Sequence, residues 1–475
     1  LEDVHALFEF EHLHRHLVAP VEDRRIREVD QQFRRVLHLR EDGLHADRFV
    51  LHVPWVHTRT RAAGTIKTHP PTESARPKRV GRDHDTMDRR GGWDLLGVTT
   101  GAFFATMVAR LVASPLVPDI IDSFRVTTGT VGLALSGMWA AYALFQFPGG
   151  VVTDRIGERR VVLLAMASIT VTSLALSAAP TIGVFAVAAV ALGASAGLYF
   201  TAGTSFLVDQ FENTGRALGV HEIGASGAGL VAPVASVAVA ARFGWRAGLL
   251  VPAVVAPVAF VLFAWRVPET PPTNPDSGWN VDPQALVALL TRPSIGFTTL
   301  VAMIAFFTWQ SFASFFPTFL IEHVGVETGR ASLVFGVVFA ITLVAAPTLG
   351  WVSDAVGRDR TLTASFLAGV AGYALFLFGD GGVTLLAAGT VLVGLGLSWP
   401  GVLNTRFMDH LAADERGTGF GLVRTVVLLV SSLGSGVTGT LAGRVGWLAA
   451  YGLVGGLLAL LVCLLVANRV LGVDA

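Results

Sequence analysis

The chain has little charge, one cysteine and no lysine after Lys78. Only 15% of its 475 residues are charged and 52% are hydrophobic, whereas soluble domains carry about 25% charged residues. The single cysteine, Cys463, excludes a disulfide within the chain and argues against a thiol-based metal site. These shortages exclude an ordinary soluble domain and are typical of a membrane protein.

The missing lysine also removes the nucleotide-binding loop Gly-x-x-x-x-Gly-Lys, whose lysine contacts phosphates. No nucleophile elbow and no metal-ligand cluster stands out in the apolar part of the sequence. We therefore predict no enzyme activity, no catalytic residue, no metal, no cofactor and no ATP-driven transport by this chain alone. A net charge of zero gives no indication of a nucleic-acid partner.

Residues 1–86 differ from the rest, since they hold ten of the thirteen histidines and no apolar signal-peptide core. We expect translation to begin at Met87, with the upstream segment a mis-annotated start or a disordered extension. A charged cytoplasmic helix over residues 21–39 is the alternative. The cluster of His12, His14 and His16 suits a metal, but a biased, solvated stretch is the safer interpretation.

Twelve apolar runs follow, each close to the roughly 20 residues that cross a bilayer as a helix. The first six lie near residues 94–120, 129–152, 160–179, 181–208, 217–241 and 245–266. The second six lie near residues 293–321, 330–352, 361–379, 382–405, 418–442 and 446–468. A proline-rich break separates the two sets. We predict an all-α membrane protein with bundles at 87–266 and 293–475, joined by a cytoplasmic linker at 267–292.

Arginine is distributed unevenly between the two sides of these spans. If both termini are cytoplasmic, the inner loops and tails hold thirteen arginines and the outer loops hold five. Positively charged loops favour the cytoplasmic side. The sequence therefore predicts a multi-pass protein of the plasma membrane with both termini in the cytoplasm.

A short charged motif occurs twice, 200 residues apart, each time between two apolar runs. The first copy supplies Gly150, Asp154, Arg155, Gly157, Arg159 and Arg160. The second copy supplies Gly350, Asp354, Gly357 and Arg358. Farther along, Asp209 recurs as Asp409. A repeat this long indicates two homologous halves, and duplicated transporters place the substrate path at the interface of their halves.

On these motifs the chain resembles the major facilitator superfamily over about residues 90–470. The resemblance implies twelve transmembrane helices in two pseudo-symmetric six-helix bundles. It implies a central cavity that opens alternately to each side, a small-molecule substrate, and a monomer in the lipid bilayer. In the fifth span the exporter pattern of that family is incomplete around Pro233, which argues against drug export.

In that family the motif loops act as a latch, and the resemblance carries this role over residue by residue. Asp154 is expected to accept hydrogen bonds near Gly417–Gly419, and Arg159 or Arg160 to pair with Asp209. A carboxylate at a helix N-terminus is favoured by the helix dipole. The alternative is that these charges only anchor the loops at the membrane interface.

The second copy of the motif predicts the mirrored contacts. Asp354 is expected to face residues 215–219, and Arg358 to pair with Asp409. Because Ala355 replaces the arginine of the first copy, this latch is expected to be the weaker one.

Ionisable residues inside the spans are costly and commonly mark a transport path. Arg110 lies near the middle of the first span, and its repeat partner is Gln310. The first and seventh helices line the cavity in the resembled family. We therefore predict a cavity with a guanidinium on one side and an amide on the other. Arginine binds carboxylate or phosphate through two parallel hydrogen bonds.

Two further charged positions lie in the fifth and eleventh spans. Arg424 either points into the cavity or extends to the inner membrane face. Glu222, beside His221, either pairs with Arg424, carries a coupling proton, or belongs to an ion pair at the membrane edge.

Polar and aromatic residues near mid-span complete the predicted site, because such groups orient ligands in apolar pockets. They are Tyr142, Gln146, Tyr199, Trp309, Trp399 and Asn404. Each of them alone is also compatible with helix packing or interfacial anchoring. We expect Gln146, Tyr199 and Gln310 in particular to face the cavity.

The combined prediction is a secondary transporter for a small organic anion, a carboxylate or phosphate ester, coupled to protons or to exchange. Efflux of drugs or amphiphilic metabolites is the alternative within transport. A membrane sensor of the same fold, which binds a ligand without carrying flux, is the alternative outside it.

Overall fold

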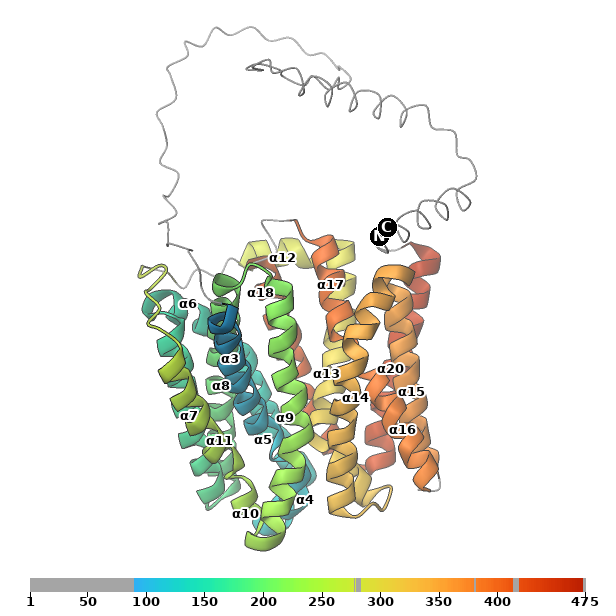
Figure 1. Cartoon of the computed structure of the whole chain (residues 1–475). Helices are drawn as coiled ribbons and strands as arrows, with labels where there is room; N and C mark the ends of the chain where they lie inside the picture. The colour runs from blue at the N-terminus through green and yellow to red at the C-terminus, as the bar shows by residue number, and fades with distance from the viewer. Residues whose placement is uncertain (1–88, 277, 279–282, 380–381, 413–417, 473–475) are drawn as a thin grey trace, which may run out of the picture. The chain divides into compact units, whose positions relative to one another are not determined.

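The computed structural model describes residues 89–276, 278, 283–379, 382–412 and 418–472 (Figure 1). The predictions made for residues 1–86, including the histidine cluster and the charged helix, lie outside these described residues. Within them the regular structure is entirely helical, and no strand occurs. The all-α prediction is confirmed.

The first six spans follow one another along the chain. They are built by α3 (Arg89–Leu111), η1 (Ser114–Leu116), α4 (Val117–Phe124), α5 (Thr128–Leu144), α6 (Gln146–Ile156), α7 (Glu158–Ala178), α8 (Ile182–Gln210), α9 (Thr214–Phe243), α10 (Trp245–Gly248) and α11 (Val251–Arg266). The second span bends by 41° at the single residue between α5 and α6. Eleven other helical stretches of the described chain are long and apolar enough to cross a membrane, so all twelve predicted spans are confirmed.

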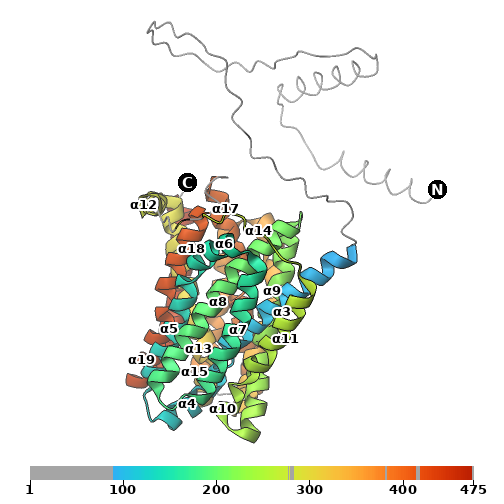
Figure 2. The same cartoon turned by 90° about the vertical axis from the view of Figure 1, so that its left-hand side faces the viewer.

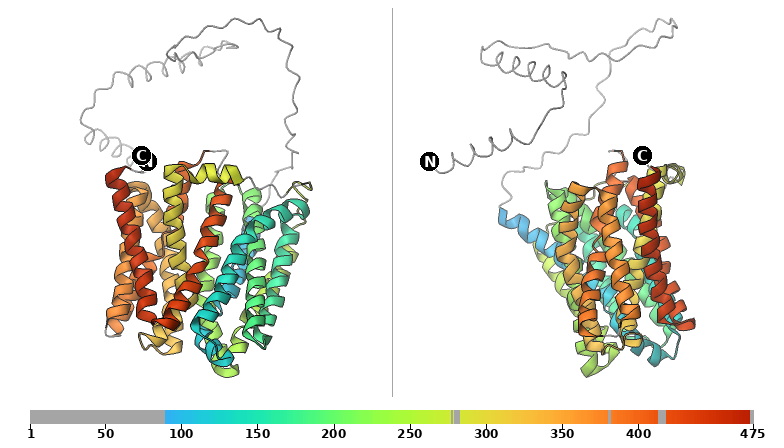
Figure 3. Two further views of the ribbon diagram at one scale, coloured as in Figure 1. Left: turned by 180° about the vertical axis from the view of Figure 1, so that it is seen from behind. Right: turned by 90° about the vertical axis from the view of Figure 1, so that its right-hand side faces the viewer.

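A short helix, α12 (Pro283–Leu290), lies within the linker between the two sets of six spans. The second set is built by α13 (Pro293–Glu322), α14 (Thr328–Val356), α15 (Arg358–Phe378), α16 (Val383–Gly396), α17 (Pro400–His410), α18 (Thr418–Ser431), α19 (Leu433–Arg444) and α20 (Trp447–Leu471). In Figures 2 and 3 these helices run side by side with those of the first set.

We call the end of the bundle at the α6–α7 and α14–α15 junctions the motif end, and the opposite end, at α4 and α10, the far end (Figure 1). At each motif-end junction a single glycine with positive φ separates two helices, Gly157 (φ 88°) and Gly357 (φ 98°). This backbone conformation favours glycine because it has no Cβ. The repeated glycine of the sequence motif is thereby explained.

The two halves are joined by hydrogen bonds in the part of the bundle between its middle and the far end. Ser136 Oγ donates to the carbonyl oxygen of Ser432 (2.6 Å) and accepts from the amide of Gly436 (2.7 Å). Ser114 Oγ donates to the carbonyl of Ser314 (3.1 Å), and Trp139 Nε1 approaches Ser314 Oγ (3.4 Å). Small residues allow this close packing between helices in a membrane. The far end of the interface is therefore closed.

Candidate functional site

Arg110 lies at the last turn of α3 and is 5% exposed. Its guanidinium carbon stands 4.2 Å from the ring centre of Tyr142 and 5.4 Å from that of Trp139, both on α5. One terminal nitrogen contacts the sulfur of Met107, while Nε has no hydrogen-bond partner. The cation is therefore supported by aromatic faces, which attract a guanidinium, and it retains an unused donor.

Arg424, on α18, comes from the other half of the chain. Its guanidinium carbon lies 4.8 Å from the ring centre of Phe200 on α8. Its Nε is likewise buried without a partner. The Phe200 ring in turn meets Tyr142, with ring centres 6.1 Å apart. Arg424 therefore points across the interface toward the first half, which favours the cavity over an extension to the membrane face.

Glu222, on α9, is exposed and interacts electrostatically with both Arg110 and Arg424. It lies two helical turns before Gly229. Gly229 packs against the ring of Phe339 in the second half. Within the described residues Glu222 forms no ion pair with either arginine. The direct pair of Glu222 with Arg424, one of three alternatives considered for Glu222, is therefore absent among the described residues, and the carboxylate interacts with the two cations only at longer range.

Gln310 and Trp309, which are adjacent on α13, lie in different surroundings. Trp309 is the residue that reaches the first half, with its ring centre 5.4 Å from that of Trp139. Gln310 is 2% exposed and its Oε1 has no hydrogen-bond partner. No hydrogen bond joins Gln310 to Arg110 within the described residues. The prediction placed these groups on two sides of a cavity and not in direct contact, so the opposition of guanidinium and amide stays a prediction.

Tyr199 and His221 do not face a cavity, contrary to our expectation for Tyr199. Both side chains are fully buried. Tyr199 Oη donates to the carbonyl oxygen of Thr99 (2.7 Å) and lies 3.0 Å from His221 Nε2. The His221 ring stacks on Phe103 at 4.2 Å. These contacts hold α3, α8 and α9 together, because a buried hydroxyl or imidazole needs partners inside the bundle.

The remaining predicted site residues lie at the bend of the second span or within the second half. Gln146 begins α6, and its Nε2 donates to the carbonyl of Tyr142 (3.4 Å), so it supports the bend of the second span. Trp399 is fully buried against Phe306, which places it inside the second half. Asn404, on α17, is half-buried.

Sequence reasoning missed the aromatic supports of the two arginines, Trp139 and Phe200. A signal for one of them was present. Trp139 and Tyr142 are three residues apart on one helix, a spacing that places two side chains on the same face. Phe200 had no such signal, since its contact with Arg424 joins helices that are far apart in sequence.

The first motif loop holds the end of the sixth span. Arg159 donates to the carbonyl oxygens of Val267 and Ala264, each at 2.8 Å. Arg159 therefore takes backbone partners in place of Asp209, because the C-terminal carbonyls of α11 offer unpaired acceptors and a favourable dipole. The alternative pairing of Arg160 with Asp209 stays a prediction. The carbonyl of Asp154 accepts from the amide of Asn274 (3.0 Å).

One predicted contact of the first motif involves residues outside the described part of the chain. Asp154 was expected to meet residues 417–419, and Gly417 lies outside the described residues. Arg155 and Asp209 each take part in an interaction. The assignment of Asp154, Arg155, Arg160 and Asp209 to a latch remains a prediction.

The second motif loop contains the pair expected between Arg358 and Asp409, with Nε and Oδ2 3.2 Å apart. Arg358 also pairs with Asp354, four residues before it. Asp354 was expected to face the start of the fifth span, and this expectation is corrected. The local arginine reaches it first, because residues four apart are neighbours across one turn.

Next to this loop lies a buried ion pair that the sequence did not predict. Arg406 is 3% exposed, and its Nε lies 2.7 Å from Asp359 Oδ1. Asn468 Nδ2 donates to the other carboxylate oxygen (3.1 Å), and Arg406 also contacts Thr298. The network joins four helices of the second half at the motif end.

No group of three or more His, Cys, Asp or Glu side chains that could hold a metal ion occurs in the part of the chain that the structure describes. The charged groups identified in this part of the bundle are two guanidiniums beside aromatic rings and one carboxylate that interacts with both.

Comparison with known proteins identifies this architecture. A profile of the Major Facilitator Superfamily matches residues 99–327 and again residues 298–472. A probable nitrate transporter of Staphylococcus epidermidis, NarT, is 22% identical over 344 residues, which make up 71% of this chain and 86% of NarT. The hexuronate transporter of Bacillus subtilis is 24% identical over 280 residues, or 55% of this chain and 65% of that protein.

Two further similarities are more limited. The uncharacterized MFS-type transporter Rv1250 of Mycobacterium tuberculosis is 29% identical over 184 residues, so the match covers 38% of this chain and only 32% of that protein. The crystal structure of the nucleoside transporter NupG has a TM-score of 0.68 at 14% identity, covering 79% of this chain and 99% of NupG, which shows a shared fold. With two profile matches that span the described helices, this chain belongs to the Major Facilitator Superfamily of membrane transporters.

Proposed function

We propose that this transporter carries a small organic anion, a carboxylate or phosphate ester, bound between Arg110 and Arg424. The observation that carries the proposal is the unpaired Nε of each arginine at the interface of the two halves. With Glu222 ionised, the two cations and one carboxylate leave an excess of one positive charge. An arginine without an acidic partner favours an anionic ligand.

The aromatic rings explain how the two cations are held ready before the anion arrives. Tyr142 lies under Arg110, and Phe200 lies under Arg424. Stacking fixes the plane of each guanidinium while leaving its edge free for hydrogen bonds. Site groups that are already ordered bind more tightly, because less conformational entropy is lost on binding.

Glu222 can couple anion binding to the uptake of a proton. When the carboxylate is ionised it competes with the substrate for the two arginines, and when it is protonated this competition ends. Anion binding and protonation of Glu222 therefore favour each other, as linkage requires. We propose proton-coupled uptake on this basis, with exchange as the alternative.

The named activities of two relatives support an anionic substrate, since one is a probable nitrate transporter and the other a hexuronate transporter. We further propose that the motif end faces the cytoplasm of a cell bounded by the plasma membrane, on the arginine distribution. Drug or metabolite efflux is a second candidate, favoured by the aromatic cluster of Trp309, Trp139, Tyr142 and Phe200.

The test uses the purified full chain and its Arg110→Ala and Arg424→Gln variants, with thermal stabilisation by a panel of carboxylates, phosphate esters and neutral drugs. Losing one charge-assisted hydrogen bond costs about 1.5–3 kcal/mol, so anion affinity should fall about 10- to 100-fold in each variant. Equal stabilisation of parent and variants by lipophilic drugs, with no response to anions, would replace the anion proposal by the efflux one.

A further inference from the structure

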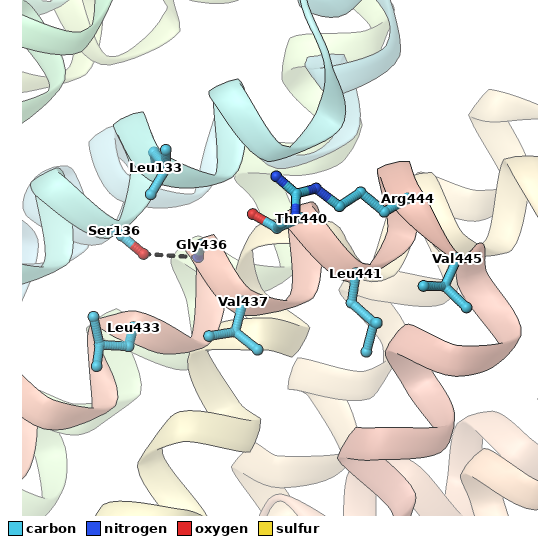
Figure 4. A pocket seen from close by; sticks show the side chains of 9 residues that line it. All are labelled: Leu133, Ser136, Leu433, Gly436, Val437, Thr440, Leu441, Arg444 and Val445. Atoms are coloured by element: carbon cyan, nitrogen blue, oxygen red, sulfur yellow. Dashed lines mark hydrogen bonds between the residues drawn. The ribbon is translucent and has the colours of Figure 1, made fainter.

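A groove runs between α5 and α19 (Figure 4). Its volume is about 440 Å³. The residues that line it are Leu133, Ser136, Leu433, Gly436, Val437, Thr440, Leu441, Arg444 and Val445. Because α5 belongs to the first half and α19 to the second, whatever fills this groove contacts both halves at once.

The groove has the length of one leaflet of a bilayer. It extends along α19 from Leu433 to Arg444, and eleven steps of about 1.5 Å give about 16 Å. The hydrocarbon core of a bilayer is about 30 Å thick, so one leaflet occupies about half of it. Arg444 closes the span Gly419–Arg444 and therefore stands at headgroup depth.

The lining divides into an apolar stripe and a single cation. Leu433, Val437, Leu441 and Val445 are spaced by four residues and therefore follow one face of the helix. The Arg444 side chain runs back toward Thr440 beside α5 (Figure 4). Within the described residues Arg444 forms no ion pair. An apolar groove that ends at an unpaired guanidinium is complementary to an acyl chain with an anionic headgroup.

A second groove of similar size offers an internal comparison. It lies between α5 and α8, has a volume of about 430 Å³, and shares Leu133 with the first. Its lining holds no charged residue. An acyl chain in the second groove would gain nothing from a negative headgroup, so the two grooves predict different lipid selectivity.

We propose that the α5–α19 groove binds an anionic phospholipid, with one acyl chain along the apolar stripe and the headgroup phosphate on Arg444. The floor of the groove is the hydrogen bond between the Gly436 amide and Ser136 Oγ, which joins the two halves (2.7 Å). A lipid seated there contacts both walls only while the far end is closed. It therefore stabilises that state, since a ligand shifts a conformational equilibrium by its differential affinity.

The test is native mass spectrometry and thermal unfolding of the full-length protein with phosphatidylglycerol or phosphatidylcholine added in detergent. A basic residue near an anionic lipid surface contributes about 1 kcal/mol, so Arg444→Gln should lower the preference for phosphatidylglycerol about fivefold. Arg242→Gln, an exposed arginine in the last turn of α9, is the matched control and should leave the preference unchanged.

Filling the grooves tests the position of the acyl chain. Val437→Trp should reduce retention of phosphatidylglycerol and its stabilising effect, whereas Val187→Trp in the second groove should preserve the headgroup preference. Unfolding midpoints without lipid, equal among the variants, establish that each has folded. Equal losses from Arg444→Gln and Arg242→Gln, or full retention by Val437→Trp, would overturn the proposal. The result does not depend on which substrate is carried.

Discussion

The guanidinium carbon of Arg110 lies 4.2 Å from the ring centre of Tyr142, so a cation inside the membrane rests on an aromatic face in place of a carboxylate. The group that offsets the cost of burying the charge is therefore different from the group that the charge can bind. The ring compensates part of the lost hydration, while the edge of the guanidinium stays free for a ligand. The contact also links α3, in the first span, to α5, in the second.

Replacing Tyr142 tests this support. Tyr142→Leu removes the ring, and a desolvated cation–π contact is worth about 2 kcal/mol, so anion affinity should fall up to about 30-fold. Tyr142→Phe keeps the ring and should retain most of the affinity. Binding isotherms of the purified variants provide the measurement. If the leucine and phenylalanine variants lose affinity equally, the phenolic hydroxyl and not the ring is the important group.

Glu222→Gln tests the coupling. The amide cannot ionise, so the variant should exchange anions across a liposome membrane at any pH near neutrality but fail to accumulate them against a gradient. Parallel uptake assays with an imposed pH difference and counterflow assays without one check this expectation. Glu212→Gln, an exposed residue between α8 and α9, serves as the control and should behave like the parent. Accumulation by Glu222→Gln at the parental level would assign the proton elsewhere.

The buried pair of Arg406 and Asp359 is expected to support the second half more than the exposed pair of Arg358 and Asp409. Breaking a buried ion pair costs about 3–5 kcal/mol, because one charge remains without a partner. An exposed pair contributes about 0–1 kcal/mol. Thermal unfolding of Asp359→Ala and Asp409→Ala gives the comparison. Equal midpoints for the two variants would contradict the assignment of a structural role to the network.

The two motif glycines provide a matched pair of substitutions. A Cβ at Gly157 would approach the carbonyl oxygen of Thr270 to 2.2 Å, whereas a Cβ at Gly357 would meet open space. Both residues have positive φ, which costs a side-chain-bearing residue about 1–2 kcal/mol. Gly157→Ala should therefore lower the unfolding midpoint and the transport rate more than Gly357→Ala does. A larger effect of Gly357→Ala would show that the first loop can shift to accept a side chain at residue 157, despite its close contact with Thr270.

Much of the architecture could be predicted because it depends on local composition. Twelve apolar runs of spanning length correspond to twelve spans, one of which is bent near Phe145. The pair of Arg358 and Asp409 was also predicted, because the resemblance to the superfamily implied this contact. The bend was not predicted, although Pro148 lies in the first turn of α6, where it cannot donate a hydrogen bond to the carbonyl of Leu144 and its ring disfavours a continuous helix.

The site was predicted only in part, because rotation about a helix axis decides which side chains meet. Trp309 and Gln310 are adjacent in sequence, yet the first reaches Trp139 and the second is buried elsewhere. Tyr199 was expected in the cavity but bonds to Thr99 inside the first half. In apolar helices, where most faces are equally hydrophobic, the sequence contains no period that would settle such rotations.

The sequence by itself determined the family, the number of spans and the presence of isolated charges within them, since hydropathy and a duplicated motif are properties of the chain. Only the tertiary structure decided that Arg110 and Arg424 rest on Tyr142 and Phe200, and that Arg159 holds α11. The physical reason is that these contacts join different helices. Their geometry follows from how twelve similar apolar surfaces pack together, and not from the composition of any one of them.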